Sequence, residues 1–158
     1  MVLGIDDQWQ ADLVDLSSLK KYNQPYRYLL TCIDIFSKFA WVVPMRDKTG
    51  HHMVQVFAKI FKERKPQNLQ TDDGTEFKNR VFQAFLKKQG VYFFTTKNET
   101  KASVVERFNR TIKSRMWKYF TSRNSNKYVG VIPKLVRDRK STRLNSSHRS
   151  LSRMPSSA

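Results

Sequence analysis

The sequence predicts a mixed α/β fold, a five-stranded sheet with helices on both of its faces. Closely spaced β-rich runs fill the first third of the chain, and the apolar period then changes to that of helices. Helical and strand-like segments alternate after that change, in the order strand-strand-strand-helix-strand-helix-strand-helix. The 158 residues provide for one compact domain with a sizeable core.

The first three strands are expected to form antiparallel hairpins, because only short turns separate them. Residues 9–16 alternate well enough for a strand, and the polar, proline-containing stretch 20–25 makes a turn. Residues 26–36 are mostly apolar and form the second strand. Ser37 and Lys38 then turn the chain into the third strand, residues 39–44.

The second part of the chain reads as three helices separated by two strands. Helical spacing of apolar residues begins at Gly50 and ends before Pro66, and it returns around residues 81–86 until Gly90. Short strands are expected at residues 68–71 and 91–95. A long helix then begins near Ser103, where Ser103 and Glu106 also fit a capping box.

The charge of the chain points to a polyanionic partner. The formal net charge is +17, and residues 137–158 hold six Lys/Arg and one Asp, which leaves +12 on residues 1–136. Residues 141–158 contain seven serines and no sustained apolar period. We therefore expect a domain over residues 1–136 and a basic, Ser-rich tail over 137–158 that is non-native or disordered.

The sequence gives no indication of disulfides, of a zinc finger or of a membrane-spanning segment. Cys32 lies in an apolar run and reads as a small buried hydrophobe, so no disulfide framework is expected. The three histidines lack cysteine partners at zinc-finger spacing. No secretory signal or membrane-spanning run appears, so the expected location is intracellular.

Three acidic residues are poorly explained by folding alone: Asp12, Asp72 and Glu106. Two lie in or at the end of strand-like runs, and Glu106 opens a helix rich in arginine and lysine. Three adjacent carboxylates repel one another unless cations neutralise them. Carboxylate oxygens are the hard ligands that Mg²⁺ prefers, so the pattern indicates divalent-metal and phosphate chemistry.

The long helix has a basic stripe beside its apolar one. At 3.6 residues per turn, Glu106, Arg110 and Lys113 share one stripe, about a third of a turn from the apolar face. Between residues 97 and 118 there are seven basic residues and two acidic ones, more cations than helix-stabilising pairs require. A phosphate backbone that passes the carboxylate would use this surplus.

Ordered motifs then resemble one family. The segments TDDGTEFKN and VVERFNRTIK, with the upstream W-x-x-D and YLLTCIDIFSKFAWVVP, are similar to the catalytic core of retroviral-type integrases. The similarity is strongest to the integrases of retrotransposons and large self-synthesising DNA transposons, and it covers about residues 7–136. It implies an RNase H-like fold and an enzyme that processes DNA 3′ ends and transfers them into target DNA.

The resemblance also implies the site. Asp12, Asp72 and Glu106 match the family's catalytic acids, which bind two Mg²⁺ or Mn²⁺ ions. Arg110 and Lys113 match helix positions that are basic in relatives and lie against the terminal nucleotides, and the nearby residues Lys101 and Arg107 complete the predicted DNA-binding set. Element ends and target DNA are the expected partners, bound by a homo-oligomer in the nucleus, with no membrane contact.

The sequence departs from the family pattern around the second acid. Asp73 follows Asp72 directly, and we choose Asp72 as the ligand because its place after LQT matches the motif, which leaves Asp73 to serve the turn. Only 33 residues separate Asp72 from Glu106, slightly fewer than is most frequent in relatives. Asp15 is expected to cap a turn, and Asp34 to end a strand.

Two further functions compete with strand transfer. A domesticated relative would hold DNA without cutting it, although the three retained acids argue for chemistry. Another RNase H-like nuclease, such as a hydrolase of RNA–DNA hybrids, fits the motif around Glu106 less well. Relatives also carry an N-terminal zinc module and a C-terminal binding module, so this polypeptide is expected to be a fragment of a larger integrase.

Overall fold

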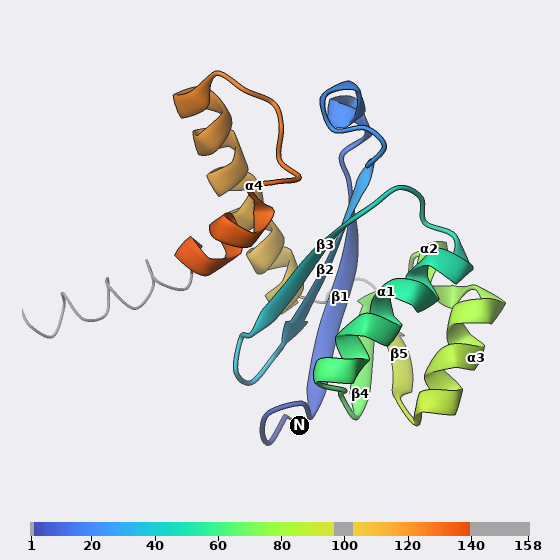
Figure 1. The fold of residues 1–158 in the computed structure, drawn as a ribbon. Helices are drawn as coiled ribbons and strands as arrows, with labels where there is room; N and C mark the ends of the chain where they lie inside the picture. The colour runs from blue at the N-terminus through green and yellow to red at the C-terminus, as the bar shows by residue number, and fades with distance from the viewer. Residues whose placement is uncertain (1, 97–102, 140–158) are drawn as a thin grey trace, which may run out of the picture.

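A computed structural model describes residues 2–96 and 103–139, which build a twisted five-stranded mixed sheet (Figure 1). The strands are β1 (Gln8–Asp15), β2 (Tyr28–Asp34), β3 (Ala40–Met45), β4 (Asn68–Asp72) and β5 (Tyr92–Thr96), in the spatial order β3-β2-β1-β4-β5. Pairing is antiparallel between β1, β2 and β3 and parallel between β1, β4 and β5. The predicted five-stranded mixed sheet is confirmed.

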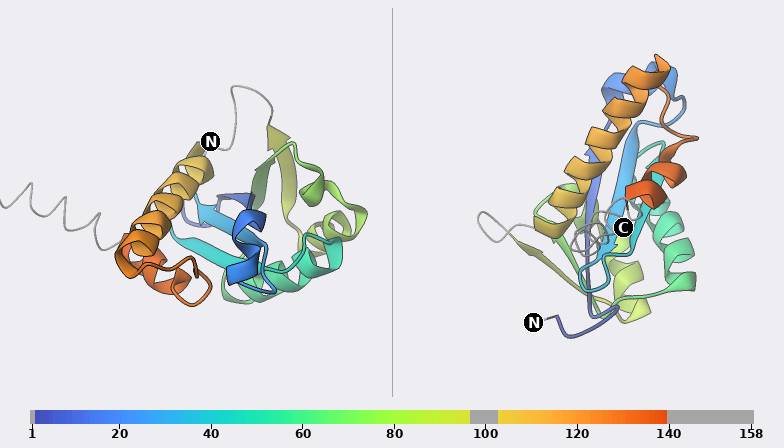
Figure 2. Two further views of the ribbon diagram at one scale, coloured as in Figure 1. Left: turned by 90° about the horizontal axis from the view of Figure 1, so that it is seen from above. Right: turned by 90° about the vertical axis from the view of Figure 1, so that its left-hand side faces the viewer.

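Helices cover both faces of the sheet (Figure 2). The helices α1 (Gly50–Glu63), α2 (Thr75–Lys78) and α3 (Arg80–Gln89) lie on one face. The long helix α4 (Ser103–Arg123) lies on the other, where a short helix over residues 132–139 packs beside it. A 3₁₀ helix, η1 (Ser17–Tyr22), connects β1 to the turn before β2.

Sequence patterns located all five strands and the three long helices, but they missed three short helices: η1, α2 and the helix at 132–139. Each of these three has fewer than nine residues, so an apolar stripe has too few repeats to stand out. The expected boundary at residue 136 falls inside the last helix. The tail prediction for residues 140–158 concerns residues outside the described part of the chain.

Each face of the sheet has its own apolar core. Trp9, Phe57 and Phe82 are completely buried between the sheet and α1, α2 and α3. On the other face, Phe108 and Met116 of α4 pack with side chains of β1, β2 and the final helix. Residues 29–34 of β2 are all buried, which explains why that strand reads as a continuous apolar run. Cys32 lies in this run and is fully buried, as expected.

The ends of α1 and α3 follow from their capping residues. The side chain of Thr49 accepts a hydrogen bond from the amide of His52, and that of Asn79 accepts one from Phe82. At the other end of α3, Gly90 has φ 76°, the left-handed conformation in which glycine carries no steric penalty. The caps thus mark where α1 and α3 begin, and Gly90 marks where the chain leaves α3 for β5.

An arginine joins the end of α1 to the base of the sheet. The Arg64 guanidinium lies 2.7 Å from a carboxylate oxygen of Asp6 and 2.7 Å from one of Asp34. Asp34 is fully buried and also accepts hydrogen bonds from the Ser37 hydroxyl and from the amides of Phe36 and Asp6. Asp34 is therefore the strand-end residue that the sequence indicated, and its carboxylate has little capacity left for a ligand.

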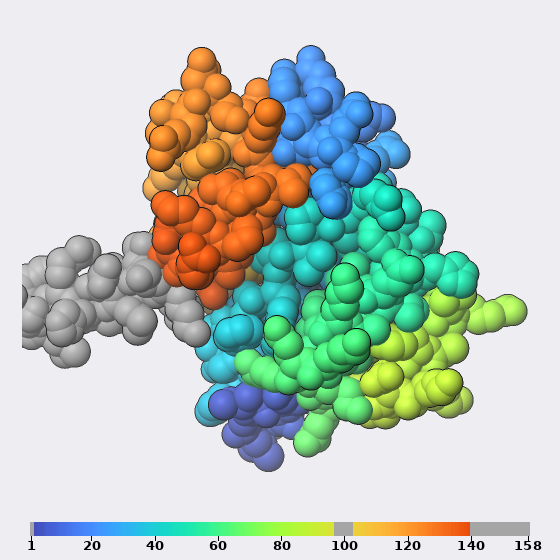
Figure 3. Space-filling view, viewed as in Figure 1, coloured from blue at the N-terminus to red at the C-terminus, as the bar shows by residue number. Residues whose placement is uncertain are grey.

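The C-terminal part of the described chain closes over the α4 face (Figure 3). The buried amide of Asn23 donates to the carbonyl of Asn126 and accepts from the amide of Tyr128, which ties the segment after α4 to the turn after η1. Arg139 is buried, lies 4.9 Å over the ring of Phe108 and donates to the carbonyl of Lys38. The folded unit thus extends to residue 139.

Replacement of Asp34 tests its structural role. Asp34→Ala leaves Arg64 and two backbone amides without their buried acceptor, so the free energy of unfolding should fall by about 3 kcal/mol in urea denaturation. Asp15→Ala is the matched control, because Asp15 is exposed and, within the described ranges, accepts only from Ser17; its loss should stay near 1 kcal/mol, about the value of a lost cap. Equal losses in the two variants would contradict a structural role specific to Asp34.

Candidate active site: three carboxylates beside a basic helix

Asp12, Asp72 and Glu106 come from three elements that meet on the α4 face of the sheet. β1 and β4 are parallel neighbours in which Gln10 pairs with Gln70, so Asp12 and Asp72 each lie two residues beyond a paired position. Residues two apart in a strand point to the same face, here the face that carries α4. Glu106 lies in the first turn of α4, which crosses β1 and β2.

The electrostatics of Asp12 show that the three acids are close. Burial is the largest cause that raises the pKa of Asp12, and the charges of Asp72 and Glu106 raise it further, to about 6. Hydrogen bonds from the Leu13 amide and the Asn109 side chain, each 2.8 Å long, oppose this rise. The fold therefore brings Asp72 and Glu106 within range of the Asp12 carboxylate.

Asn109 is a site residue that sequence reasoning missed. It lies one turn after Glu106, is buried, and donates from its side-chain amide to Oδ2 of Asp12. Its own Oδ1 is buried without a hydrogen-bond partner among the described residues. The sequence did contain a signal for Asn109. Its amide side chain lies three residues after Glu106 at the edge of the apolar stripe, and a polar side chain at such a buried edge needs a hydrogen-bond partner.

The donor set fits a hard divalent cation. Three carboxylates, one of them with an elevated pKa, offer several oxygen ligands and an excess of negative charge that Mg²⁺ or Mn²⁺ would neutralise. In the described residues no three His, Cys, Asp or Glu side chains are already gathered as closely as in a formed metal centre. The charges of Asp72 and Glu106 thus act on the Asp12 carboxylate.

The two adjacent aspartates have different surroundings. Asp72 is half-buried and its Oδ1 accepts from the amide of Gly74 at 3.1 Å. Asp73 is exposed and forms an ion pair with Lys78. Asp72 thus makes a hydrogen bond within the turn. A Cβ at position 74 would come within 2.5 Å of Glu76 Oε2 and 3.2 Å of Asp72 Oδ1, so a larger residue there would make these side chains shift.

A row of side-chain amides crosses the sheet beside the acids. Gln8 and Gln10 on β1 both donate to Oε1 of Gln70 on β4, at 2.7 and 2.9 Å. Gln70 in turn donates to the hydroxyl of Thr96 on β5 at 3.2 Å. Oε1 of Gln10 accepts from the amide of Val105 at 2.9 Å, so the first turn of α4 is capped from β1.

The outer face of α4 is strongly basic. Arg107, Arg110 and Lys113 are all exposed. A shallow groove of about 580 Å³ on this face has no acidic residue in its lining, which consists of Arg107, Arg110, Thr111, Ser114, Arg115 and Lys118. Lys101, the fourth residue predicted to bind DNA, lies outside the described residues. No helix in the described ranges is long and apolar enough to span a membrane.

Comparisons with known proteins agree with this architecture. The family described as "Integrase core domain" matches residues 5–101. A transposon-derived protein of Caenorhabditis elegans is 37% identical over 123 residues, which cover 77% of this chain and 43% of that protein. A Ty1 Gag-Pol polyprotein of Saccharomyces cerevisiae is 33% identical over 98 residues, covering 57% of this chain and 6% of the polyprotein. The chain thus spans less than half the length of these relatives.

Solved structures share the fold. The catalytic core domain of HTLV-2 integrase, in complex with magnesium, superposes with a TM-score of 0.68 at 24% identity, and each chain is covered to 86%. The intasome of simian T-cell lymphotropic virus gives a TM-score of 0.72 at 19% identity, covering 86% of this chain and 48% of that one. These likenesses confirm the RNase H-like fold that the sequence resemblance implied.

The raised pKa of Asp12 predicts how stability depends on pH. The folded state holds this proton more tightly than the unfolded chain, so the free energy of unfolding should fall as pH rises from 3.8 to about 6. Asp12→Asn removes the buried charge and should stabilise the metal-free protein at pH 7 by about 1–2 kcal/mol, with no gain at pH 4. Urea denaturation with a chelator present measures both values. A destabilised variant at pH 7 would contradict the prediction.

Proposed function

This chain belongs to the integrase core domain family, and from that premise we propose that it is the catalytic core of an enzyme that integrates mobile-element DNA. Integration requires that DNA phosphodiesters be cut and rejoined. The observation that carries the proposal is the meeting of Asp12, Asp72 and Glu106 beside the exposed cations of α4. An acidic centre and an adjacent phosphate-binding face are the two parts that such chemistry needs.

We propose Asp12, Asp72 and Glu106 as the ligands of two Mg²⁺ or Mn²⁺ ions. When bound, such ions stabilise the attacking and leaving oxygens of an in-line displacement at phosphorus. The donor set fits these ions, and the HTLV-2 core that shares this fold was solved with magnesium. Asn109 would hold the Asp12 carboxylate in one orientation, as hydrogen-bonded outer groups do in many metal sites.

Two successive displacements would use the same centre. In 3′-end processing, a water oxygen attacks a phosphodiester near the end of the element, and the 3′ oxygen leaves with a proton as a free hydroxyl. In strand transfer, that hydroxyl attacks a target phosphodiester and a target 3′ oxygen leaves. Arg110 and Lys113 would hold the strand that enters the site by its phosphates, because both are exposed on the helix that carries Glu106.

The two reactions require two DNA partners. We propose that the chain binds element ends and target DNA, and that it acts as a homo-oligomer in the nucleus, where target DNA lies. The virus integrase of similar fold was solved as an intasome. A DNA-holding protein without chemistry is the alternative. The three carboxylates favour an enzyme over a protein that only holds DNA. Burial of Asp12 beside two like charges destabilises the fold, and a protein without metal chemistry would gain nothing in return.

Loss of Glu106 should abolish the chemistry. With labelled element-end duplexes and Mg²⁺ or Mn²⁺, Glu106→Gln should lower 3′ processing and strand transfer by about 100-fold or more, the scale seen when one group that stabilises developing charge is removed. Glu63→Gln is the matched control, because Glu63 is exposed on α1 and its side chain bonds to Trp41, away from the three acids. Unchanged activity in Glu106→Gln would exclude Glu106 from the catalytic set.

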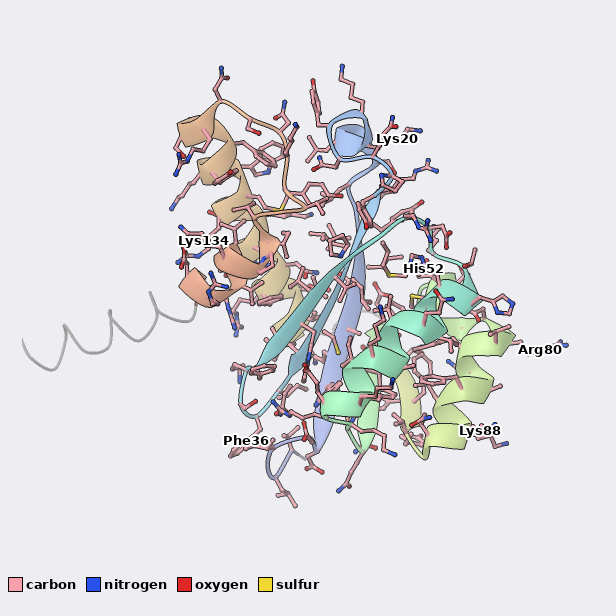
Figure 4. All side chains as sticks on the ribbon, in the orientation of Figure 1. Lys20, Phe36, His52, Arg80, Lys88 and Lys134 are labelled. Atoms are coloured by element: carbon pink, nitrogen blue, oxygen red, sulfur yellow. The ribbon has the colours of Figure 1, made fainter. Side chains whose placement is uncertain are left out.

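Removal of the basic stripe should change the salt dependence of DNA binding. Arg110→Ala with Lys113→Ala removes two phosphate contacts, so the slope of log K against log salt should become shallower by about 1.8. Lys87→Ala with Lys88→Ala removes the same charge from the far end of α3 (Figure 4) and should change the slope much less. Fluorescence anisotropy over a salt series measures the slopes. Equal changes in both variants would mean that only net charge matters.

A further inference from the structure

Gln10 touches all three elements that carry the candidate metal ligands. It lies on β1 itself, its side chain donates to Gln70 on β4, and it accepts from the backbone of Val105 on α4. We propose that Gln10 is a positioning residue that sets the spacing of the three carboxylates. This inference rests on the proposed function, and it assigns a role to a residue that carries no charge.

Gln10 and its two hydrogen-bond partners each lie one or two residues before one of the three acids. Gln10 precedes Asp12 by two residues on the same face of β1. Gln70 precedes Asp72 by two residues on β4, and Val105 is the residue directly before Glu106. A shift of the Gln10 amide would therefore move all three carboxylates relative to one another.

The orientation of the Gln10 amide is fixed by its partners. The backbone amide of Val105 can only donate, so the Gln10 atom that faces it must be the oxygen. The Gln10 nitrogen then donates to Oε1 of Gln70, whose own nitrogen donates to Thr96. Gln10 and Gln70 are both buried, which protects these bonds from competition by water.

The contact with α4 satisfies a donor that the helix cannot satisfy itself. The first amides of a helix have no intrahelical acceptor, and Val105 is in the first turn of α4. The usual partner is a side chain directly before the helix, whereas here it is on a strand 95 residues earlier. The start of α4 is thus placed relative to β1, and the position of Glu106 follows from it.

Hydrogen exchange provides a test that does not depend on activity or metal. In the full chain, the Val105 amide should be protected although it lies in a first turn. Gln10→Met keeps the size of the side chain but loses the acceptor, so the exchange rate of the Val105 amide should rise about tenfold or more. The amide of Met116, in the middle of α4, should keep its rate, which would show that the change is local.

The sheet itself offers a matched control. Gln8 lies on the same strand and face and donates to the same oxygen of Gln70, but its side-chain bond reaches β4 rather than α4. Gln8→Met should therefore leave the exchange rate of Val105 unchanged. Gln10→Glu, measured at low pH where its carboxyl is protonated, keeps an acceptor for Val105 and a donor for Gln70. It should retain the protection, which separates the loss of the bond from a general loss of packing.

Titration calorimetry with Mn²⁺ alone then tests the effect on the carboxylates. Gln10→Met should weaken Mn²⁺ binding by about 10- to 100-fold, the range seen when supporting residues of metal sites are replaced. Gln8→Met should bind within about twofold of the unaltered chain. If the unaltered chain binds no Mn²⁺, the proposed function is wrong, while the exchange data still decide whether Gln10 holds α4. Equal exchange and equal affinity in the two methionine variants would overturn the inference.

Discussion

The repulsion among Asp12, Asp72 and Glu106 is the constraint around which this part of the molecule is built. Burial and two neighbouring charges make ionised Asp12 unfavourable, so other interactions must hold the acids in place. Asn109 contributes a hydrogen bond to Asp12, and the amide row fixes the start of α4. The cations of α4 point outward, where they cannot neutralise the site from within.

The two faces of the sheet differ in the residues that line them. The face under α1 and α3 is wholly apolar in its centre, with Trp9, Phe57 and Leu69 completely buried. On the opposite face, α4 packs on apolar residues of β1 and β2, and the polar row of β1, β4 and β5 lies beside it. The apolar core under α1 and α3 therefore supports the strands whose opposite face carries the polar row.

Periodicity and ordered motifs predicted most of this fold, and the comparisons confirm the family resemblance. The three acids were found from local signals, because two lie in or at the end of strand-like runs and Glu106 opens a basic helix; their role as a catalytic set stays a prediction. Asn109 and Gln10 were not found, because a buried amide acquires its meaning from a partner that is distant in sequence. The Asp72–Asp73 pair was ambiguous for the same reason, since only the fold shows Asp73 paired to Lys78.

The length of the connections between β1 and α4 has a consequence for synthesis of the chain. The bonds from Val105 to Gln10 and from Asn109 to Asp12 join residues 95 and 97 positions apart. Contacts of such separation require closure of a long loop and slow the search for the native state. On a ribosome, a chain translated only through β5 has both aspartates but neither Glu106 nor the Asn109 side chain that donates to Asp12. The three acids can therefore come together only after the last long helix has been made.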